Sequence, residues 1–222
     1  MRATVLASLL LFGCASAHRP RAAETVADDP DSDACPQPGK LDARKASEAC
    51  EKGSFDACER ECAQRHADAC FVRGLLAERA DEPTSASWFR RACVAGSAIA
   101  CTNFAATGFA KKSPLDGACM LALFESACAA EEPFGCGMIG RMYAEGRGVT
   151  ADPGRAKKQL DQACTKFGGF PCHFLGLYLA DGKLGPADLA AARTALERGC
   201  KTGYKPACAS LDQLETPNAG TY

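Results

Sequence analysis

The chain has 222 residues, of which 47% are hydrophobic and 24% charged, which is the balance of a chain that folds around apolar cores. Its formal net charge is −1, so it has no basic field that would attract nucleic acid, and we expect no nucleic-acid partner. The 15 cysteines are the unusual feature of the composition, because most of them recur at one fixed spacing.

Residues 1–13 have the pattern of an export signal, with Arg2 followed by the apolar run "ATVLASLLLFG". That run is shorter than the roughly 20 residues that span a bilayer. Two cleavage sites compete at or just after its C-terminal end. "LFGC" resembles the lipobox of bacterial lipoproteins, which is cut before a cysteine that then carries a lipid, whereas "ASA" at 15–17 suits ordinary secretion. We predict a lipoprotein-type signal and lipidation at Cys14.

Export by either route gives a location outside the cytoplasm. The protein would lie at the periplasmic face of the outer membrane as a lipoprotein, or be secreted or periplasmic, and it would meet a membrane only through its N-terminal lipid anchor. Residues 14–40 are rich in Ala, Pro and Asp without apolar periodicity, so we predict a flexible tether there. Disulfides persist outside the cytoplasm, and lipidation of Cys14 would leave an even number of thiols to form them.

Six pairs of cysteines are each separated by seven residues, and four of the pairs form a longer repeat. The first cysteines of those four pairs are 35, 36 and 36 residues apart, at Cys93, Cys128, Cys164 and Cys200. A period near 36 residues is typical of a solenoid built from helix–turn–helix units.

The residues around the pairs agree with helices that meet at the cysteines. A bulky apolar residue stands four positions before each first cysteine of the repeat, as one face of a helix requires: Phe89, Phe124, Leu160 and Leu196. Glycines that commonly end helices follow most first cysteines: Gly53, Gly96, Gly168 and Gly203. A small residue that allows close helix packing stands four positions after the second cysteine: Gly74, Ala105, Gly140 and Gly176.

Two stretches, "GMIGRMYAEGRGVTADPGRAKKQLDQAC" and "HFLGLYLADGKLGPADLAAARTALERGC", resemble Sel1-like repeats, which are related to tetratricopeptide arrays. The resemblance implies an all-α fold, a right-handed α/α solenoid of Sel1-like helix–turn–helix repeats stapled by disulfides. It covers 41–215 and is strongest over 132–165. We predict a truncated N-terminal cap repeat at 41–65, the repeat array at 66–215 and a disordered tail at 216–222.

The cysteine-rich subgroup of this family, known from secreted bacterial proteins, carries the same C-x7-C spacing. There it joins the end of one helix to the start of the next, which suits the short separation that a disulfide needs. Each closed loop of about nine residues would stabilise the fold by about 2.5 kcal/mol. The resemblance thus implies six bridges: Cys50–Cys58, Cys62–Cys70, Cys93–Cys101, Cys128–Cys136, Cys164–Cys172 and Cys200–Cys208. Cys35 and Cys119 remain, and either they pair with one another or Cys119 is a small buried hydrophobe.

The sequence offers little for metal or redox chemistry. It has no C-x-x-C, and His18, His66 and His173 are scattered, so we predict no metal site, no cofactor and no catalytic residue. Some cysteine-rich family members are described as penicillin-binding or β-lactamase-like. This chain has a "KTG" at Lys201–Gly203 but no S-x-x-K, and Gly203 is better explained as a helix stop.

Binding is therefore the function that we predict. In related arrays the first helix of each unit lines a concave surface, and Arg141, His173 and Tyr178 lie on or beside such helices, where they would contact a partner or simply pack. We expect a non-catalytic protein–protein interaction scaffold of the bacterial cell envelope, whose partner is an unknown protein or envelope component. The alternatives are a β-lactam-binding or β-lactamase-like hydrolase, by family analogy, and an envelope stabiliser without a specific partner.

Overall fold

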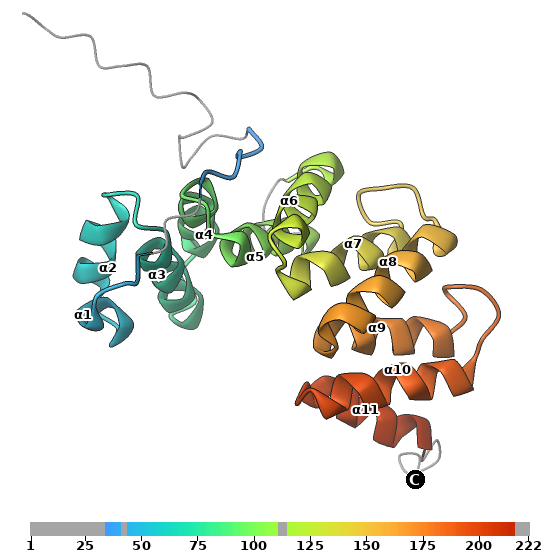
Figure 1. The fold of residues 1–222 in the computed structure, drawn as a ribbon. Helices are drawn as coiled ribbons and strands as arrows, with labels where there is room; N and C mark the ends of the chain where they lie inside the picture. The colour runs from blue at the N-terminus through green and yellow to red at the C-terminus, as the bar shows by residue number, and fades with distance from the viewer. Residues whose placement is uncertain (1–33, 41–43, 111–114, 216–222) are drawn as a thin grey trace, which may run out of the picture.

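The computed structural model describes residues 34–40, 44–110 and 115–215, and the predictions for the signal peptide, Cys14 and the tail at 216–222 lie outside them. Within these residues the chain is helical and no strand is formed (Figure 1). The helices are α1 (Glu48–Glu51), α2 (Phe55–Cys62), α3 (Ala67–Arg79), α4 (Ser85–Val94), α5 (Ala98–Phe109), α6 (Gly117–Ala129), α7 (Pro133–Glu145), α8 (Pro153–Phe167), α9 (Gly169–Ala180), α10 (Leu189–Lys201) and α11 (Lys205–Glu215). In this described part, no helix combines the length and the apolar character needed to cross a membrane.

The helices pack in chain order along a curved path (Figure 1). The pairs α3–α4, α5–α6, α7–α8 and α9–α10 form successive units, and α11 packs on both α9 and α10. The first helices of neighbouring units also touch, since α7 contacts α5 and α9. This is the all-α solenoid that the sequence predicts.

The junctions between units show why the chain turns where it does. After Cys50 and Cys93 the helix stops at Gly53 and Gly96, whose φ angles of 98° and 97° lie in the left-handed region that glycine adopts without strain. The following serines then cap the next helix; the Ser97 side chain, for example, accepts a hydrogen bond from the Ala100 backbone N–H. At two junctions a non-glycine residue takes the left-handed position, Arg65 at 59° and Glu131 at 62°.

All six C-x7-C pairs are disulfides, each joining the end of one helix to the start of the next. Their Cα–Cα distances run from 4.4 to 4.8 Å. The disulfide-stapled solenoid is therefore confirmed, with a covalent link at every helix-to-helix junction where one unit passes to the next.

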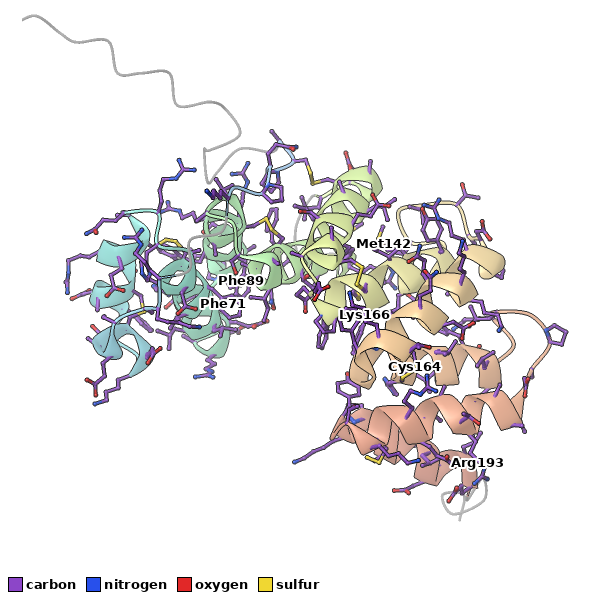
Figure 2. The ribbon with its side chains drawn as sticks, in the orientation of Figure 1. Phe71, Phe89, Met142, Cys164, Lys166 and Arg193 are labelled. Atoms are coloured by element: carbon purple, nitrogen blue, oxygen red, sulfur yellow. A yellow bond between two sulfur atoms is a disulfide. The ribbon has the colours of Figure 1, made fainter. Side chains whose placement is uncertain are left out.

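Small residues let the two helices of a unit approach closely. A Cβ atom added at Gly140 would lie 2.5 Å from Leu160 Cγ, and one added at Gly176 would lie 2.6 Å from Leu196 Cγ. Gly74 meets Phe89 in the same way, and Figure 2 shows Phe89 beside Phe71 at the α3–α4 contact. Two repeat positions are thus packing partners. One is the small residue four positions after the second cysteine of a pair, and the other is the bulky residue four positions before the first cysteine of the next pair.

Residues 34–40 differ from the flexible tether that the sequence predicts up to residue 40. Cys35 is bonded to Cys119 of α6, with a Cα–Cα distance of 5.5 Å. Pro36 is fully buried, and the Ala34 carbonyl accepts a hydrogen bond of 3.0 Å from Arg90 Nη2 of α4. This segment is therefore part of the folded body, because a covalent bond and burial both hold it there.

Candidate functional site

A groove of about 500 Å³ crosses the face formed by α3, α5, α7 and α9, the first helices of four units. Within the described residues four large hydrophobic side chains are exposed, and two of them, Ile99 (46%) and Phe134 (44%), lie in this groove. The remaining lining is also mostly apolar, with Phe71, Leu75, Ala106, Phe109, Ala110, Met138 and Phe170. We call this lining the first-helix groove.

Equivalent repeat positions build the first-helix groove. Ile99, Phe134 and Phe170 each stand two residues before the second cysteine of their pair. Five residues after that cysteine the units carry Leu75, Ala106 and Arg141, at successive places along the groove. Ala106 is the smallest of these three, so its side chain leaves the most room in the groove at the position on α5.

One end of the first-helix groove is cationic. The Arg141 guanidinium lies between two rings, with its Cζ atom 4.6 Å from the Phe109 centroid and 4.3 Å from the Phe174 centroid. Arg147 covers Phe109 as well, at 4.3 Å, and its Nη1 donates a 2.7 Å hydrogen bond to the Phe109 carbonyl. Such stacking is favourable because the ring face carries negative charge, and it also fixes the guanidinium in place.

Glu145, at the C-terminal end of α7, interacts with three neighbours through hydrogen bonds and ion pairs. Arg141 Nη2 lies 3.1 Å from Glu145 Oε1, and Arg147 Nη2 lies 3.7 Å from Glu145 Oε2. The Tyr178 hydroxyl donates a short hydrogen bond to the same carboxylate. Burial, together with the hydrogen bond to Glu145 and its negative charge, raises the pKa of Tyr178 far above its usual range, so this hydroxyl stays a donor.

His173 lies beside this network on α9. Its Nε2 is 3.0 Å from Ser210 Oγ of α11, while its Nδ1 is buried and has no hydrogen-bond partner among the described residues. Burial lowers the pKa of His173, and the positive charge of Arg141 lowers it further. The imidazole is therefore neutral near pH 7, since protonation would add a buried N–H without an acceptor.

The structure brings the three sequence-predicted binding residues together. Arg141 and Tyr178 share Glu145, and the rings of His173 and Tyr178 lie 5.1 Å and 5.7 Å from that of Phe174. Sequence reasoning missed Glu145 and Phe174. Phe174 stands two residues after its second cysteine, as the groove residues Asn103 and Met138 do, so repeat alignment was a usable signal for it.

An aromatic cluster continues from the groove toward α11. Phe134 stacks on Phe170 with centroids 4.2 Å apart, and Phe170 meets Phe174 at 4.7 Å. Tyr204 meets Phe170 edge-on at 6.2 Å. Because these rings come from three units, the cluster depends on the stacking of the units and not on one helix alone.

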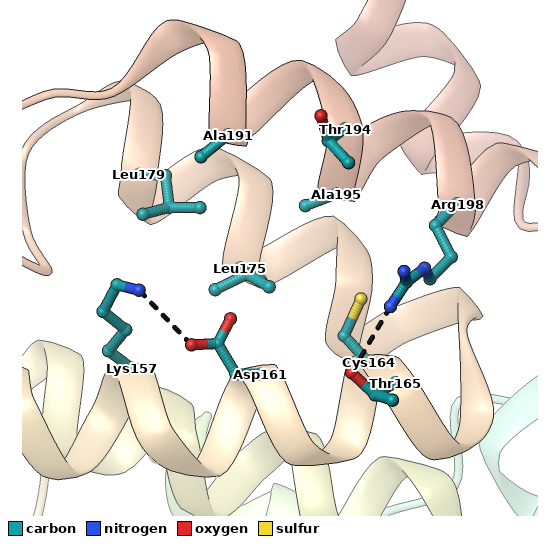
Figure 3. A pocket seen from close by; sticks show the side chains of 10 residues that line it. All are labelled: Lys157, Asp161, Cys164, Thr165, Leu175, Leu179, Ala191, Thr194, Ala195 and Arg198. Atoms are coloured by element: carbon teal, nitrogen blue, oxygen red, sulfur yellow. Dashed lines mark hydrogen bonds and ion pairs between the residues drawn. The ribbon is translucent and has the colours of Figure 1, made fainter.

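A second groove, of about 350 Å³, lies between α8 and α10 above α9 (Figure 3). Its polar side chains already bond with one another, since Lys157 Nζ lies 3.3 Å from Asp161 and Arg198 Nη1 lies 3.3 Å from Thr165 Oγ1. Among the described residues, its lining contains no aromatic side chain, whereas the first-helix groove has four, so the first-helix groove is the better candidate site.

The "KTG" at Lys201–Gly203 forms the end of α10. The Thr202 hydroxyl donates to the Gly199 carbonyl at 2.7 Å and accepts from the Gly169 backbone N–H at 2.9 Å. Gly203 has φ 83°, as expected for the helix stop that the sequence predicts. The hydroxyl thus joins the two helices of one unit, α9 and α10. Over the described ranges, no group of three or more His, Cys, Asp or Glu side chains is placed to hold a metal ion.

Known proteins with this architecture are solenoids of the same kind. No family model matches the chain. A Sel1 repeat protein from Oxalobacter formigenes superposes with a TM-score of 0.67 at 20% identity, over 78% of this chain and 76% of that one. The protective antigen c5321 of uropathogenic Escherichia coli, which displays an SLR fold, gives 0.50 at 18% identity, over 78% of this chain and 44% of that one.

A curated relative shares part of the sequence. Cytochrome c oxidase assembly factor 7A of Xenopus laevis is 32% identical over 105 residues, which are 43% of this chain and 46% of that protein. The chain thus matches somewhat less than half the length of this relative. Its stacked helix pairs, its repeat length and its structural neighbours agree, and the chain has the fold of the Sel1-like repeat proteins.

Proposed function

We propose that this chain is a non-catalytic scaffold, exported to the bacterial cell envelope, that binds a partner protein in the first-helix groove. The observation that carries the proposal is the exposure of Ile99 and Phe134 in a groove lined mostly by apolar side chains. Exposed apolar residues gathered in one groove commonly mark a binding surface. The Sel1-like repeat fold supports a protein–protein interaction role.

Export is supported by the disulfides. The described residues hold seven of them, and disulfides of this density persist where the surroundings are oxidising. We further propose that a lipid attached to Cys14 anchors the protein to the membrane. Mass spectrometry of the mature protein would detect the lipid, and Cys14→Ala should move the protein from the membrane fraction to the soluble fraction.

Partner binding is tested by site-specific photo-crosslinking in cells that make the protein. A benzophenone side chain replaces Ile99 or Phe134 in the groove, and in a matched control it replaces Leu189, which is 58% exposed but lies at the start of α10. We expect the two groove positions to crosslink to the same protein, identified by mass spectrometry, and Leu189 to miss it. Equal crosslinking at all three positions, or none in the groove, would contradict the proposal.

A binding role also predicts the absence of β-lactam turnover. Purified protein incubated with a chromogenic cephalosporin should hydrolyse it no faster than buffer does, because the Thr202 hydroxyl of the "KTG" is engaged with backbone groups. Turnover above buffer that disappears on changing Lys201 to Ala would make the hydrolase alternative correct.

A further inference from the structure

We infer that the first-helix groove takes an extended peptide segment of a partner protein, with a bulky apolar side chain over Ala106 and a neighbouring carboxylate against Arg141. This inference rests on the proposed function and names the chemistry of the partner.

The shape of the groove favours a side chain of a peptide. Ala106 and Ala110 present only methyl groups, while Phe71 of α3 and Phe134 of α7 rise on either side. The volume of about 500 Å³ is within the range of pockets that enclose a ligand. Its lining runs across four first helices, a span of roughly 30 Å at about 10 Å per helix, which about nine residues of extended chain would cover.

The charges at one end of the groove favour a carboxylate. Two arginines, Arg141 and Arg147, face one glutamate, Glu145, which leaves a formal charge of +1. Glu145 accepts from Arg141 through Nε and Nη2, each at 3.1 Å. Arg141 Nη1 lies 3.9 Å from the Met138 sulfur, which is a weak acceptor, and the guanidinium also interacts with the Tyr178 hydroxyl. A carboxylate on the occupant would give Arg141 Nη1 a charged oxygen acceptor, which is stronger than a thioether sulfur.

Arg141 is also held ready for such a contact. Its guanidinium is clamped between Phe109 and Phe174, and its side chain is only 23% exposed. A donor that is already fixed loses little rotamer freedom on binding, so the contact costs less entropy than one with a flexible surface lysine.

Glu132, the other charged residue of the groove lining, makes no matching demand for a cation. Glu132 caps α7, and its carboxylate accepts from the Phe134 and Gly135 backbone N–H groups at 3.0 and 2.7 Å. It also accepts from the Thr102 hydroxyl at 2.6 Å. Because these oxygens are engaged, the cationic end is the one that selects the charge of the occupant.

The test is a selection with a displayed library of random dodecapeptides on the purified, oxidised full chain. Ala106→Trp fills the groove and serves for counter-selection; Ala191→Trp, at an alanine of similar exposure on α10, is the matched control. Circular dichroism and thermal unfolding of both variants verify that they fold. We expect enriched peptides to share a bulky apolar residue next to Asp or Glu, and to bind Ala106→Trp at least 10-fold more weakly than Ala191→Trp.

A double-mutant cycle then locates the carboxylate. The acidic residue of an enriched peptide is replaced by its amide, and Arg141→Gln is made in the protein. The amide should weaken binding about 10-fold to the wild-type chain and less than 2-fold to Arg141→Gln. Equal losses in both proteins, enriched peptides without an acidic residue, or no peptide that discriminates Ala106→Trp would each overturn the inference.

The inference would also be overturned if sedimentation experiments showed that the wild-type chain is a dimer and that Ala106→Trp is a monomer. The occupant of the groove would then be a second copy of the chain. The crosslinking experiment distinguishes failure of the proposed binding role from failure of the proposed peptide chemistry. A partner that crosslinks from Ile99 and Phe134 while the library yields no acidic motif would leave the binding role intact and refute only the peptide chemistry.

Discussion

His173 shows how the environment of one residue creates a pH response. Its pKa lies below the usual value because of burial, and because of the nearby charge of Arg141. The folded state thus binds this proton less readily than the unfolded state, so the stability it contributes is complete above the unfolded pKa of about 6.5 and falls as the pH drops toward the folded pKa. Urea unfolding of the wild-type chain should give a lower free energy of unfolding at pH 5.5 than at pH 7.5.

Substitution identifies His173 as the source of that difference. His173→Gln removes the titrating group, so the difference in unfolding free energy between the two pH values should shrink. Ser210→Ala is the matched control, because it removes the hydrogen-bond partner of Nε2 and leaves the imidazole in place. A pH dependence that is as steep in His173→Gln as in the wild type would show that another group is responsible.

For individual residues, the sequence predicted which side chains lie at the candidate site but not which contacts they make there. Arg141, His173 and Tyr178 could be selected because they are polar or aromatic residues on first helices. Glu145, which links two of them, lies in "AEGRG", where a glutamate is typical of any solvated turn. Its role depends on how α9 stacks on α7, and that geometry is not encoded in any local pattern.

The α7–α8 pair shows how one glycine sets the distance between two helices. Gly140→Ala would place a Cβ atom 2.5 Å from Leu160 Cγ, so the helices would have to separate or Leu160 would have to leave its preferred conformation. We expect a loss of about 1–3 kcal/mol in the free energy of unfolding, despite the higher helix propensity of alanine. Denaturant unfolding followed by circular dichroism measures it.

Gly154→Ala is the control on the neighbouring helix. Gly154 is exposed in the first turn of α8, and a Cβ atom there would meet nothing closer than Asp152 Oδ1 at 3.5 Å. This variant should be as stable as the wild type or slightly more stable. If Gly140→Ala behaved like Gly154→Ala, close approach at Gly140 would not be what selects the small residue.

Helix junctions were the elements most open to prediction. Cysteine spacing and the glycines after the first cysteines locate the turns, because a disulfide fixes a short distance and a left-handed φ favours glycine. Arg65 and Glu131 take the same left-handed position without that signal. The first-helix groove was harder to predict from the sequence. It arises from the difference in side-chain volume between Ala106 and its equivalents Leu75 and Arg141 in neighbouring units.

At the scale of the whole molecule, the Cys35–Cys119 bond differs from the other six disulfides. They close loops between adjacent helices, at a sequence separation of 8, whereas this bond has a separation of 84 and ties the segment before α1 to α6. A solenoid has mainly contacts between neighbours, so its ends can open independently of its middle. The long-range bond opposes this by fastening the chain on both sides of α1–α5.

Removal of this bond should therefore affect stability more than removal of a local staple. Cys35→Ser with Cys119→Ala should lower the free energy of unfolding by about 4 kcal/mol, against about 2.5 kcal/mol for loss of Cys50–Cys58, because loop-closure entropy grows with loop length. Urea unfolding should also broaden or split, as the units before α6 open first. Intact mass verifies that the remaining bridges are formed. An unchanged, single transition would show that packing and the local disulfides are enough to hold α1–α5, and that the long-range bond does not couple the two ends of the array.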